Sequence, residues 1–254
     1  MRLCVPIPCF FGGMDFCDAI KRVSELGFDA VETYNWKQLD LGRVRETCRE
    51  NGVELLSMCT SYFNMTAKEE RGAWLEGLCE SVLAVNQAGV SRLITQVGPD
   101  TGEERARQHE HIVGALKEAK PFLEEHQVTL MIEPLNTYVN HPGYYLTSSR
   151  EAFDIVREVD SPCVKVVYDI YHQQVMEGNI IPSVTANLDL IAHLHAAGHP
   201  GRHEPFFGEN DYRFIFDAID RAGYTGACGL EYGPTLPPAE SLLECLKRYG
   251  GKEQ

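Results

Sequence analysis

The sequence predicts a (β/α)8 TIM barrel, a closed α/β barrel of eight strand–helix units that forms a single domain over residues 1–254. Its length of 254 residues is usual for such a barrel. Short apolar runs alternate eight times with longer amphipathic runs, as expected for a parallel sheet whose strands are joined by helices. The apolar runs are rich in Val, Ile and Leu without polar alternation, which indicates strands buried on both faces.

The expected elements follow one another along the whole chain. Glycine follows the first three expected helices, at Gly27, Gly52 and Gly89, because it closes a last helical turn at low cost. Helices are expected at about 15–26, 41–50, 67–88, 103–126, 149–159, 212–222 and 239–249, with a short helical stretch after 169. Strands are expected at about 3–7, 30–32, 55–58, 93–96, 129–133, 164–169, 191–195 and 227–231.

The alternative fold is a doubly wound open sheet. Such a sheet would be expected to carry a glycine-rich turn after its first strand. Gly12 and Gly13 are present there, but the dinucleotide-binding pattern GxGxxG is not. The closed barrel is therefore favoured, and no dinucleotide site is predicted.

The composition argues against several kinds of partner. The formal net charge is -14, and an acidic surface repels phosphate backbones, so a nucleic acid partner is not expected. No apolar run approaches the roughly 20 residues that cross a bilayer, so no membrane partner is expected. The first residues lack the apolar segment and cleavage site of a secretion signal. Nine cysteines are scattered without a CxxC pair, which is typical of reduced thiols, and we expect a cytoplasmic protein.

Four polar residues stand at the expected ends of the last four strands. Glu133, Asp169, His195 and Glu231 end strands five, six, seven and eight. The carboxyl ends of barrel strands meet at one rim, where reactive groups of such enzymes lie. These four side chains are therefore expected to converge. Three carboxylates and one imidazole suit Mn²⁺, Mg²⁺ or Co²⁺ better than a thiolate-binding ion.

Each of these residues also has an ordinary structural interpretation. Glu133 could simply end a strand before Pro134, and Asp169 could cap the helix that follows it. His195 could be a buried core histidine, and Glu231 could pair with an arginine. The argument for a metal site depends on the four occurring together.

Five stretches of the second half match a known family in order and spacing. At these residues the chain resembles the xylose isomerase-like barrel superfamily, and more narrowly the hydroxypyruvate isomerase family. The first half fits only generally, through LGFDAVE at 26–32. The stretches are IEPLNT at 132–137, YDIYHQ at 168–173, MEG at 176–178, PGRHEP at 200–205 and GLEY at 229–232.

The resemblance implies one divalent metal ion, with Mn²⁺ favoured, held by Glu133, Asp169, the residue at 195 and Glu231. It implies that Glu133 and Glu231 face each other across the substrate as the acid/base pair. Contacts to the substrate would come from His172 and Arg202, with Glu204 as a further candidate.

Two departures from the hydroxypyruvate isomerase pattern bear on the substrate. That family usually carries Gln where this chain has His195, whereas the related ketose 3-epimerases carry His. The family's Asn-Thr-Arg after strand five reads Asn136-Thr137-Tyr138, so a basic group is missing. Both departures argue against hydroxypyruvate itself and leave the proton-transfer chemistry intact.

The expected reaction moves a proton between adjacent carbons of a small keto sugar or keto acid through an enediolate. Return of the proton to the same carbon would instead give an epimerase. A ketose 3-epimerase of the D-tagatose or D-psicose type and a 2-oxo-tetronate isomerase therefore remain alternatives. An endonuclease-like enzyme would need zinc-binding histidines in the first half, and a non-catalytic sugar-binding barrel would be expected to lose Glu133 or Glu231, so both are disfavoured.

The loops give further expectations about the substrate and the assembly. The loop at 233–238 is rich in proline, which removes amide donors for phosphate, so an unphosphorylated substrate is favoured. Aromatic residues follow the first three strands. They would either wall the pocket or form the interface of a homo-oligomer, and they are Phe10, Phe11, Trp36, Tyr62 and Phe63.

Overall fold

Eight parallel strands pair in chain order, and the eighth pairs with the first to close a barrel. The structure is a computed structural model that describes residues 1–251. The prediction of a (β/α)8 barrel is confirmed. The strands are β1 (Arg2–Pro6), β2 (Ala30–Thr33), β3 (Glu54–Cys59), β4 (Arg92–Thr95), β5 (Thr129–Ile132), β6 (Val164–Asp169), β7 (Ile191–His195) and β8 (Ala227–Gly229).

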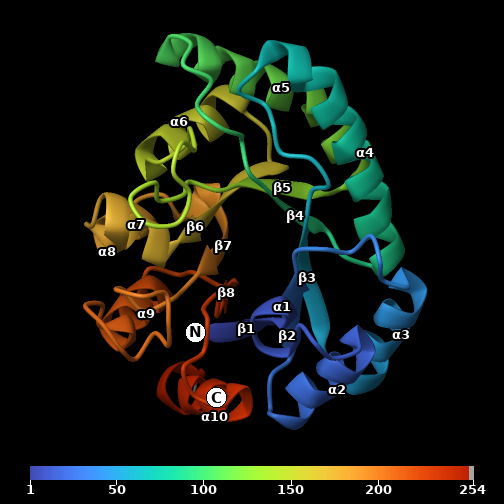
Figure 1. Ribbon diagram of the computed structural model, residues 1–254, viewed down its shortest axis with the longest axis vertical. Coiled ribbons are helices and arrows are strands. Elements are labelled where there is room, and N and C mark those ends of the chain that lie inside the picture. Colours follow the sequence, from blue (N-terminus) through green and yellow to red (C-terminus); the bar gives the residue numbers. More distant parts are fainter. Residues whose placement is uncertain (252–254) are drawn as a thin grey trace.

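Helices form a ring around these strands (Figure 1). Within residues 1–251, no helix is both long and apolar enough to cross a membrane. The α-helices are α1 (Ile7–Phe11), α2 (Phe16–Glu25), α3 (Leu41–Asn51), α4 (Arg71–Ala88), α5 (Arg105–His126), α6 (Ser149–Val159), α7 (Ile170–Met176), α8 (Ile180–Thr185), α9 (Tyr212–Arg221) and α10 (Pro238–Tyr249). Two short 3₁₀ helices are η1 (Lys68–Glu70) and η2 (Leu188–Leu190).

The sequence sets the ends of several helices. Oδ1 of Asp15 accepts hydrogen bonds from the amides of Cys17 and Asp18, which caps the start of α2. Gly52 and Gly89 close α3 and α4 at φ values of 63° and 75°, where a residue with a Cβ would be strained. The expectation that glycine ends these helices is confirmed.

Most expected strand ends differ from the structure by one or two residues, and those of β5 and β8 involve candidate site residues. Strand β5 ends at Ile132, because Pro134 has no amide hydrogen with which to continue the ladder beyond Glu133. Strand β8 ends at Gly229, because the chain turns where the amide of Tyr232 donates to the carbonyl of Leu230 at 3.1 Å. Glu133 is therefore the first residue after β5, and Glu231 is the second residue after β8.

Two short helices were not expected. The first strand was expected to include Ile7, but α1 begins there, and Pro8 fits the first turn of a helix because its missing amide hydrogen would have no partner. Helix α8 spans only six residues, too few to show a helical periodicity in the sequence.

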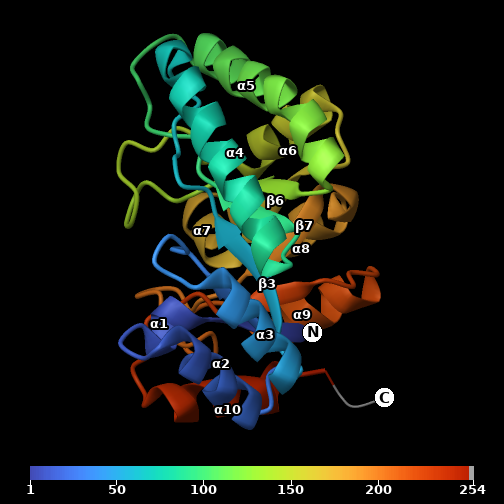
Figure 2. The ribbon, with the colours of Figure 1, turned by 90° about the vertical axis from the view of Figure 1, so that its right-hand side faces the viewer.

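The carboxyl ends of the strands share one face of the barrel. In Figure 2, β3 points toward the side on which α1 and α7 lie, while the N-terminus lies on the opposite side. Side chains that follow the strand ends are thus brought together from distant parts of the sequence.

Candidate active site

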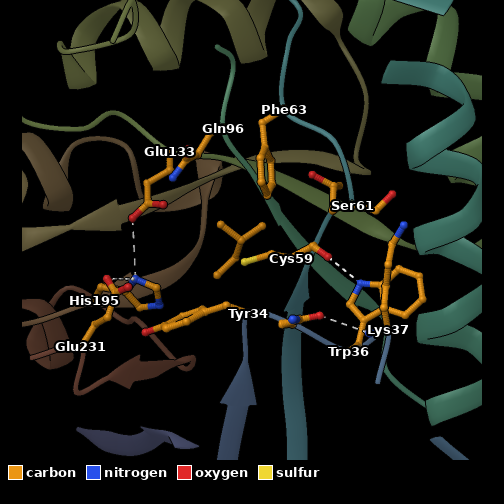
Figure 3. Close-up of a pocket in the computed structure, with 13 residues that line it drawn as sticks. Tyr34, Trp36, Lys37, Cys59, Ser61, Phe63, Gln96, Glu133, His195 and Glu231 are labelled. Atoms are coloured by element: carbon orange, nitrogen blue, oxygen red, sulfur yellow. Dashed lines mark hydrogen bonds and ion pairs between the residues drawn. The ribbon is translucent and has the colours of Figure 1, made fainter. Parts of the chain in front are cut away.

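The four residues expected to converge lie at one mouth of the barrel. Nδ1 of His195 is 3.7 Å from Oε1 of Glu133 and 3.2 Å from Oε2 of Glu231. Figure 3 shows the imidazole between the two carboxylates. Asp169 lies beside the two glutamates, because Glu133, Asp169, His172 and Glu231 each offer a ligand atom within 4.8 Å of the others; this group contains His172 and not His195.

Asp169 uses its two oxygens differently. Oδ1 accepts hydrogen bonds from the amides of Tyr171 at 2.7 Å and His172 at 3.2 Å, so it caps α7. Oδ2 is buried and has no hydrogen-bond partner within the described residues. The ordinary interpretation of Asp169 as a cap is therefore correct, and it leaves one oxygen available as a ligand.

His172 lies closer to the carboxylates than expected for a residue assigned only to the substrate. Its Nδ1 is 3.2 Å from the amide nitrogen of Asn136, which donates to it, and 2.7 Å from Nδ2 of the same residue. Its Nε2 is 3.4 Å from Oδ2 of Asp169. Burial lowers the pKa of His172 to about 3, so the ring is neutral. Because Nδ1 accepts, the proton of the neutral ring is on Nε2, which points at the carboxylates as a donor.

His195 has the opposite arrangement. Its Nε2 lies 3.4 Å from Oε2 of Glu32 in the barrel interior, and its Nδ1 faces Glu133 and Glu231. Burial alone would lower the pKa of His195, but the negative charges of Glu32 and Glu231 raise it well above its ordinary value. In the singly protonated ring, the proton belongs on Nε2, which leaves Nδ1 as an electron-pair donor.

Arg202 reaches into the carboxylate group from the loop after β7. Its Nη2 is 2.7 Å from Oε2 of Glu231 and 3.6 Å from Oδ2 of Asp169, and its guanidinium lies 5.4 Å from the ring centre of Tyr171. The interpretation that Glu231 pairs with an arginine is thus also correct. The arginine is next to the candidate ligands rather than at the surface.

Glu204 is placed apart from these groups. Its buried carboxylate accepts hydrogen bonds from the amide and hydroxyl of Thr235, the amide of Leu236 and the hydroxyl of Ser241. These bonds tie the loop after β7 to the loop after β8. The structure therefore does not bring Glu204 to the other candidate residues, and we treat it as a residue that supports the loops.

The carboxylates differ in their electrostatic surroundings. Burial raises the pKa of Glu133 above its ordinary value, although the nearby His195 opposes this. Burial also raises the pKa of Asp169 to about 6, although Arg202 opposes this. Burial would raise the pKa of Glu231 as well, but His195 and Arg202 hold it well below its ordinary value. Two neighbouring carboxylates with opposite shifts are typical of acid/base sites.

A cavity of about 450 Å³ opens beside these residues, a size that suits a small molecule. Glu133, His195 and Glu231 stand at one end, Trp36 stands at the other, and the ring of Phe63 lies between them (Figure 3). Of the aromatic residues expected to wall the pocket, these two do so. The cavity is lined by Tyr34, Asn35, Trp36, Lys37, Cys59, Thr60, Ser61, Phe63, Ile94, Gln96, Glu133, His195 and Glu231.

The site fits a divalent cation, judged by its own atoms. Oδ2 of Asp169 and Nδ1 of His195 are buried and lack hydrogen-bond partners within residues 1–251. Buried polar atoms are rarely left without a partner in folded proteins. With the carboxylates of Glu133 and Glu231, which lie beside Nδ1 of His195, these atoms offer the mixed oxygen and nitrogen donors that a hard or borderline cation takes.

The sequence interpretation missed a second buried group. Glu32, Ser57 and His193 surround the inner side of His195. Two signals were available: a carboxylate in the short strand β2, whose four residues are all buried, and a histidine two residues before His195, which faces the same side of β7.

The fold and the site can now be compared with known proteins. The description of the matching family is "Xylose isomerase-like TIM barrel", and the match covers residues 20–249. The chain belongs to this family. The resemblance stated from the second half is thereby confirmed.

Curated relatives within the xylose isomerase-like family are similar over most of their length. The hydroxypyruvate isomerase of Escherichia coli (strain K12) is 28% identical and covers 92% of this chain and 94% of its own. The 2-oxo-tetronate isomerase of Pectobacterium atrosepticum is 29% identical and covers 88% of each chain.

Solved structures of the family share the fold. The family 2 AP endonuclease from Brucella melitensis has a TM-score of 0.91 and 23% identity, and the match covers 98% of this chain and 100% of that one. A D-psicose 3-epimerase has a TM-score of 0.82 and 20% identity, with 99% of this chain and 100% of that one covered. At these identities the likeness shows the fold alone.

Proposed function

We propose that this chain is a metal-dependent isomerase, similar to hydroxypyruvate isomerase, that moves a proton between adjacent carbons of a small unphosphorylated keto sugar or keto acid. That it is an isomerase is confirmed by curated relatives, which carry isomerase names. The observation that carries the finer proposal is the position of Glu133 and Glu231 on either side of Nδ1 of His195, at the end of a small cavity.

Glu133, Asp169, His195 and Glu231 are assigned to hold the cation. The direction of the two histidines supports this choice, because Nδ1 of His195 can donate an electron pair once a bound cation displaces its proton, whereas Nε2 of His172 carries the proton of its neutral ring. Mn²⁺ is favoured, and Mg²⁺ or Co²⁺ suits the same oxygen-rich set. When bound, the cation supplies charge stabilisation for the carbonyl and hydroxyl oxygens of the substrate.

The two glutamates move the proton. One carboxylate removes a proton from the carbon beside the carbonyl, which leaves an enediolate, and the other returns a proton to the substrate. Return to the neighbouring carbon shifts the carbonyl group and gives isomerisation. The two roles exchange when the reaction runs in reverse.

His172 and Arg202 are assigned to substrate oxygens. Nε2 of His172 presents a proton beside the carboxylates, and the guanidinium of Arg202 lies next to Glu231. Both are donors where negative charge develops on the enediolate.

The cavity supports an unphosphorylated substrate. Among the described residues that line it, Lys37 is the one with a permanent positive charge, and its amine lies 2.9 Å from Oε2 of Glu80. A phosphate would therefore find few donors at this wall. Apart from Glu133, His195 and Glu231, the remaining polar lining is uncharged, as suits hydroxyl groups.

The test is proton exchange in D₂O followed by NMR. The protein is stripped of metal, restored with Mn²⁺ or Mg²⁺, and offered hydroxypyruvate, tartronate semialdehyde, 2-oxo-tetronate and a panel of free ketoses. We expect metal-dependent loss of a carbon-bound proton signal from at least one compound, with formation of its isomer. The absence of exchange for every compound, with metal bound, would overturn the proposal.

A ketose 3-epimerase is the second candidate. His195 stands where the hydroxypyruvate isomerase family usually carries Gln, and Tyr138, at the position of a family arginine, is 77% exposed. The tyrosine at 138 leaves less positive charge for a substrate carboxylate, and a histidine at 195 matches the ketose 3-epimerase pattern. In the same experiment, inversion at the exchanged carbon without carbonyl migration would establish this candidate over the first.

A further inference from the structure

A buried carboxylate lies directly behind the proposed metal site. Glu32 is 1% exposed, and no Lys or Arg side chain of residues 1–251 pairs with it. Its Oε2 accepts a hydrogen bond from Oγ of Ser57 at 2.7 Å and lies 3.2 Å from Nε2 of His193 and 3.4 Å from Nε2 of His195. Two hydrogen bonds therefore reach this oxygen, from Ser57 and His195, while Oε1 of Glu32 has no partner within residues 1–251. Because burying a carboxylate is costly unless its partners compensate, its place behind His195 points to a role in the site.

The surrounding barrel wall is shaped for this contact. A Cβ at Gly229 would lie 2.1 Å from Oε1 of Glu32 and 2.7 Å from Cδ2 of His195, so a side chain there would displace both. The pairing of β2 with β3 shifts register between Val31 and Glu32, an irregularity of the kind that redirects a side chain. Two independent local features thus make room for Glu32 beside His195.

We propose that Glu32 is a positioning residue for the metal site. It holds Nε2–H of His195 toward the barrel interior and so presents Nδ1 to the space between Glu133 and Glu231. A carboxylate on the outer nitrogen of a metal-binding histidine fixes the ring and makes it a stronger ligand. Ser57 and His193 keep the carboxylate in place. This inference rests on the proposed function, because it assumes that His195 binds the cation.

The principal test is the affinity for Mn²⁺, measured by electron paramagnetic resonance on the purified full chain. Glu32→Gln keeps the size of the side chain and removes its charge, and we expect Mn²⁺ binding to weaken about 10- to 100-fold. The control is Glu177→Gln, which changes a carboxylate whose hydrogen bonds within residues 1–251 go to Ser149, and it should leave the affinity unchanged. Equal affinity of the wild type and Glu32→Gln would overturn the role of Glu32.

A double-mutant cycle tests whether Glu32 acts through His195. His195→Asn places an amide oxygen near the position of Nδ1 and has no atom at the position of Nε2, so it cannot contact Glu32. In that background, Glu32→Gln should change the Mn²⁺ affinity by less than about twofold. If Glu32→Gln weakens Mn²⁺ binding equally in the wild type and in His195→Asn, Glu32 does not act through His195.

A spectroscopic measurement separates positioning from general destabilisation. In the Co²⁺-loaded wild type, the Nε2 proton of His195 should give a paramagnetically shifted NMR signal that exchanges slowly with water. In Glu32→Gln this exchange should accelerate, while the thermal midpoint of the metal-free protein stays near that of the wild type. An unchanged exchange rate would contradict the proposal.

Other outcomes are also decisive. Should Glu32→Gln not fold, Glu32→Asp keeps the charge but withdraws it by one methylene, and the same loss of Mn²⁺ affinity is expected. A wild type that binds no divalent cation would overturn the metal site and this role together. If the wild type binds Mn²⁺ and Glu32→Gln binds it equally tightly, only the role of Glu32 is overturned.

Discussion

Nη2 of Arg202 lies 2.7 Å from Oε2 of Glu231. The guanidinium thus neutralises part of the charge of a carboxylate that is assigned to the cation. Arg202→Gln should therefore strengthen Mn²⁺ binding, because a like charge is removed, and lower kcat/KM about 10- to 100-fold, because a charged donor to the substrate is lost. Titration with Mn²⁺ and steady-state kinetics measure the two effects.

Arg43→Gln is the matched control for Arg202. Arg43 is half-exposed and pairs with Asp15, and neither residue is among the candidate site residues. It should change neither quantity. Weaker Mn²⁺ binding by Arg202→Gln would mean that the arginine supports the site rather than competing for it.

The two glutamates should be indispensable for turnover. Glu133→Gln and Glu231→Gln each remove a proton acceptor, so kcat should fall at least about 10²- to 10⁴-fold at saturating Mn²⁺. Because both are also assigned as ligands, Mn²⁺ occupancy has to be measured in the same samples. Near-normal turnover of either variant with metal bound would contradict the acid/base assignment, and Glu103→Gln, an exposed carboxylate, serves as the control.

The cation should stabilise the fold by mass action. Mn²⁺ at 100 times its dissociation constant should add about 2.7 kcal/mol to the free energy of unfolding, which is about 5–11 °C in Tm for a chain of this size. Asp169→Asn is the informative variant, because its amide oxygen can still cap α7 while its charge is lost. Without metal, the Asp169→Asn variant should have the Tm of the wild type without metal. On addition of Mn²⁺, its Tm should rise much less than that of the wild type. A gain equal to that of the wild type would exclude Asp169 as a ligand.

His172 should act as a donor and not as a ligand. His172→Gln should lower kcat by about 10²-fold through loss of its proton and leave the Mn²⁺ dissociation constant unchanged. Since burial lowers the pKa of His172 to about 3, the ring is neutral above that value and its titration should not break the pH–rate profile near 6.5. A large loss of Mn²⁺ affinity in this variant would make His172 a ligand instead.

Gly229 should tolerate no side chain. Gly229→Ala would drive its Cβ against Glu32 and His195, so the free energy of unfolding should fall by about 1–3 kcal/mol and Mn²⁺ binding should weaken. Gly72→Ala, in α4 with open space around it, should instead be neutral or slightly stabilising. Chemical denaturation compares the two variants, and equal stabilities would argue against the packing described.

Local patterns in the sequence predicted the fold well. Alternating apolar and amphipathic runs gave eight strands and their long helices because each run carries its own periodicity. Asp169 and His195 are the last residues of β6 and β7, as expected. The short helices α1 and α8 had no comparable signal, and the ends of β5 and β8 depended on turns that the pattern did not reveal.

Long-range contacts limited the prediction of the site. Glu32 and His195 are 163 residues apart, and their contact arises only when β8 closes the barrel against β1. Glu204 was expected near the substrate because it is close to Arg202 in the sequence, but the loop turns it toward Thr235. The single domain over 1–254, the homo-oligomer, the cytoplasmic location and the absence of a nucleic acid partner remain predictions.

The divided use of Asp169 links the cation to the backbone of a neighbouring helix. One oxygen holds the amides of Tyr171 and His172, while the other points toward the candidate ligands. A movement of that carboxylate on cation binding would therefore change the hydrogen bonds in the first turn of α7. This turn carries His172, which is assigned to the substrate. Hydrogen exchange at these two amides should therefore report whether the site is loaded, even without a substrate or a reaction to follow.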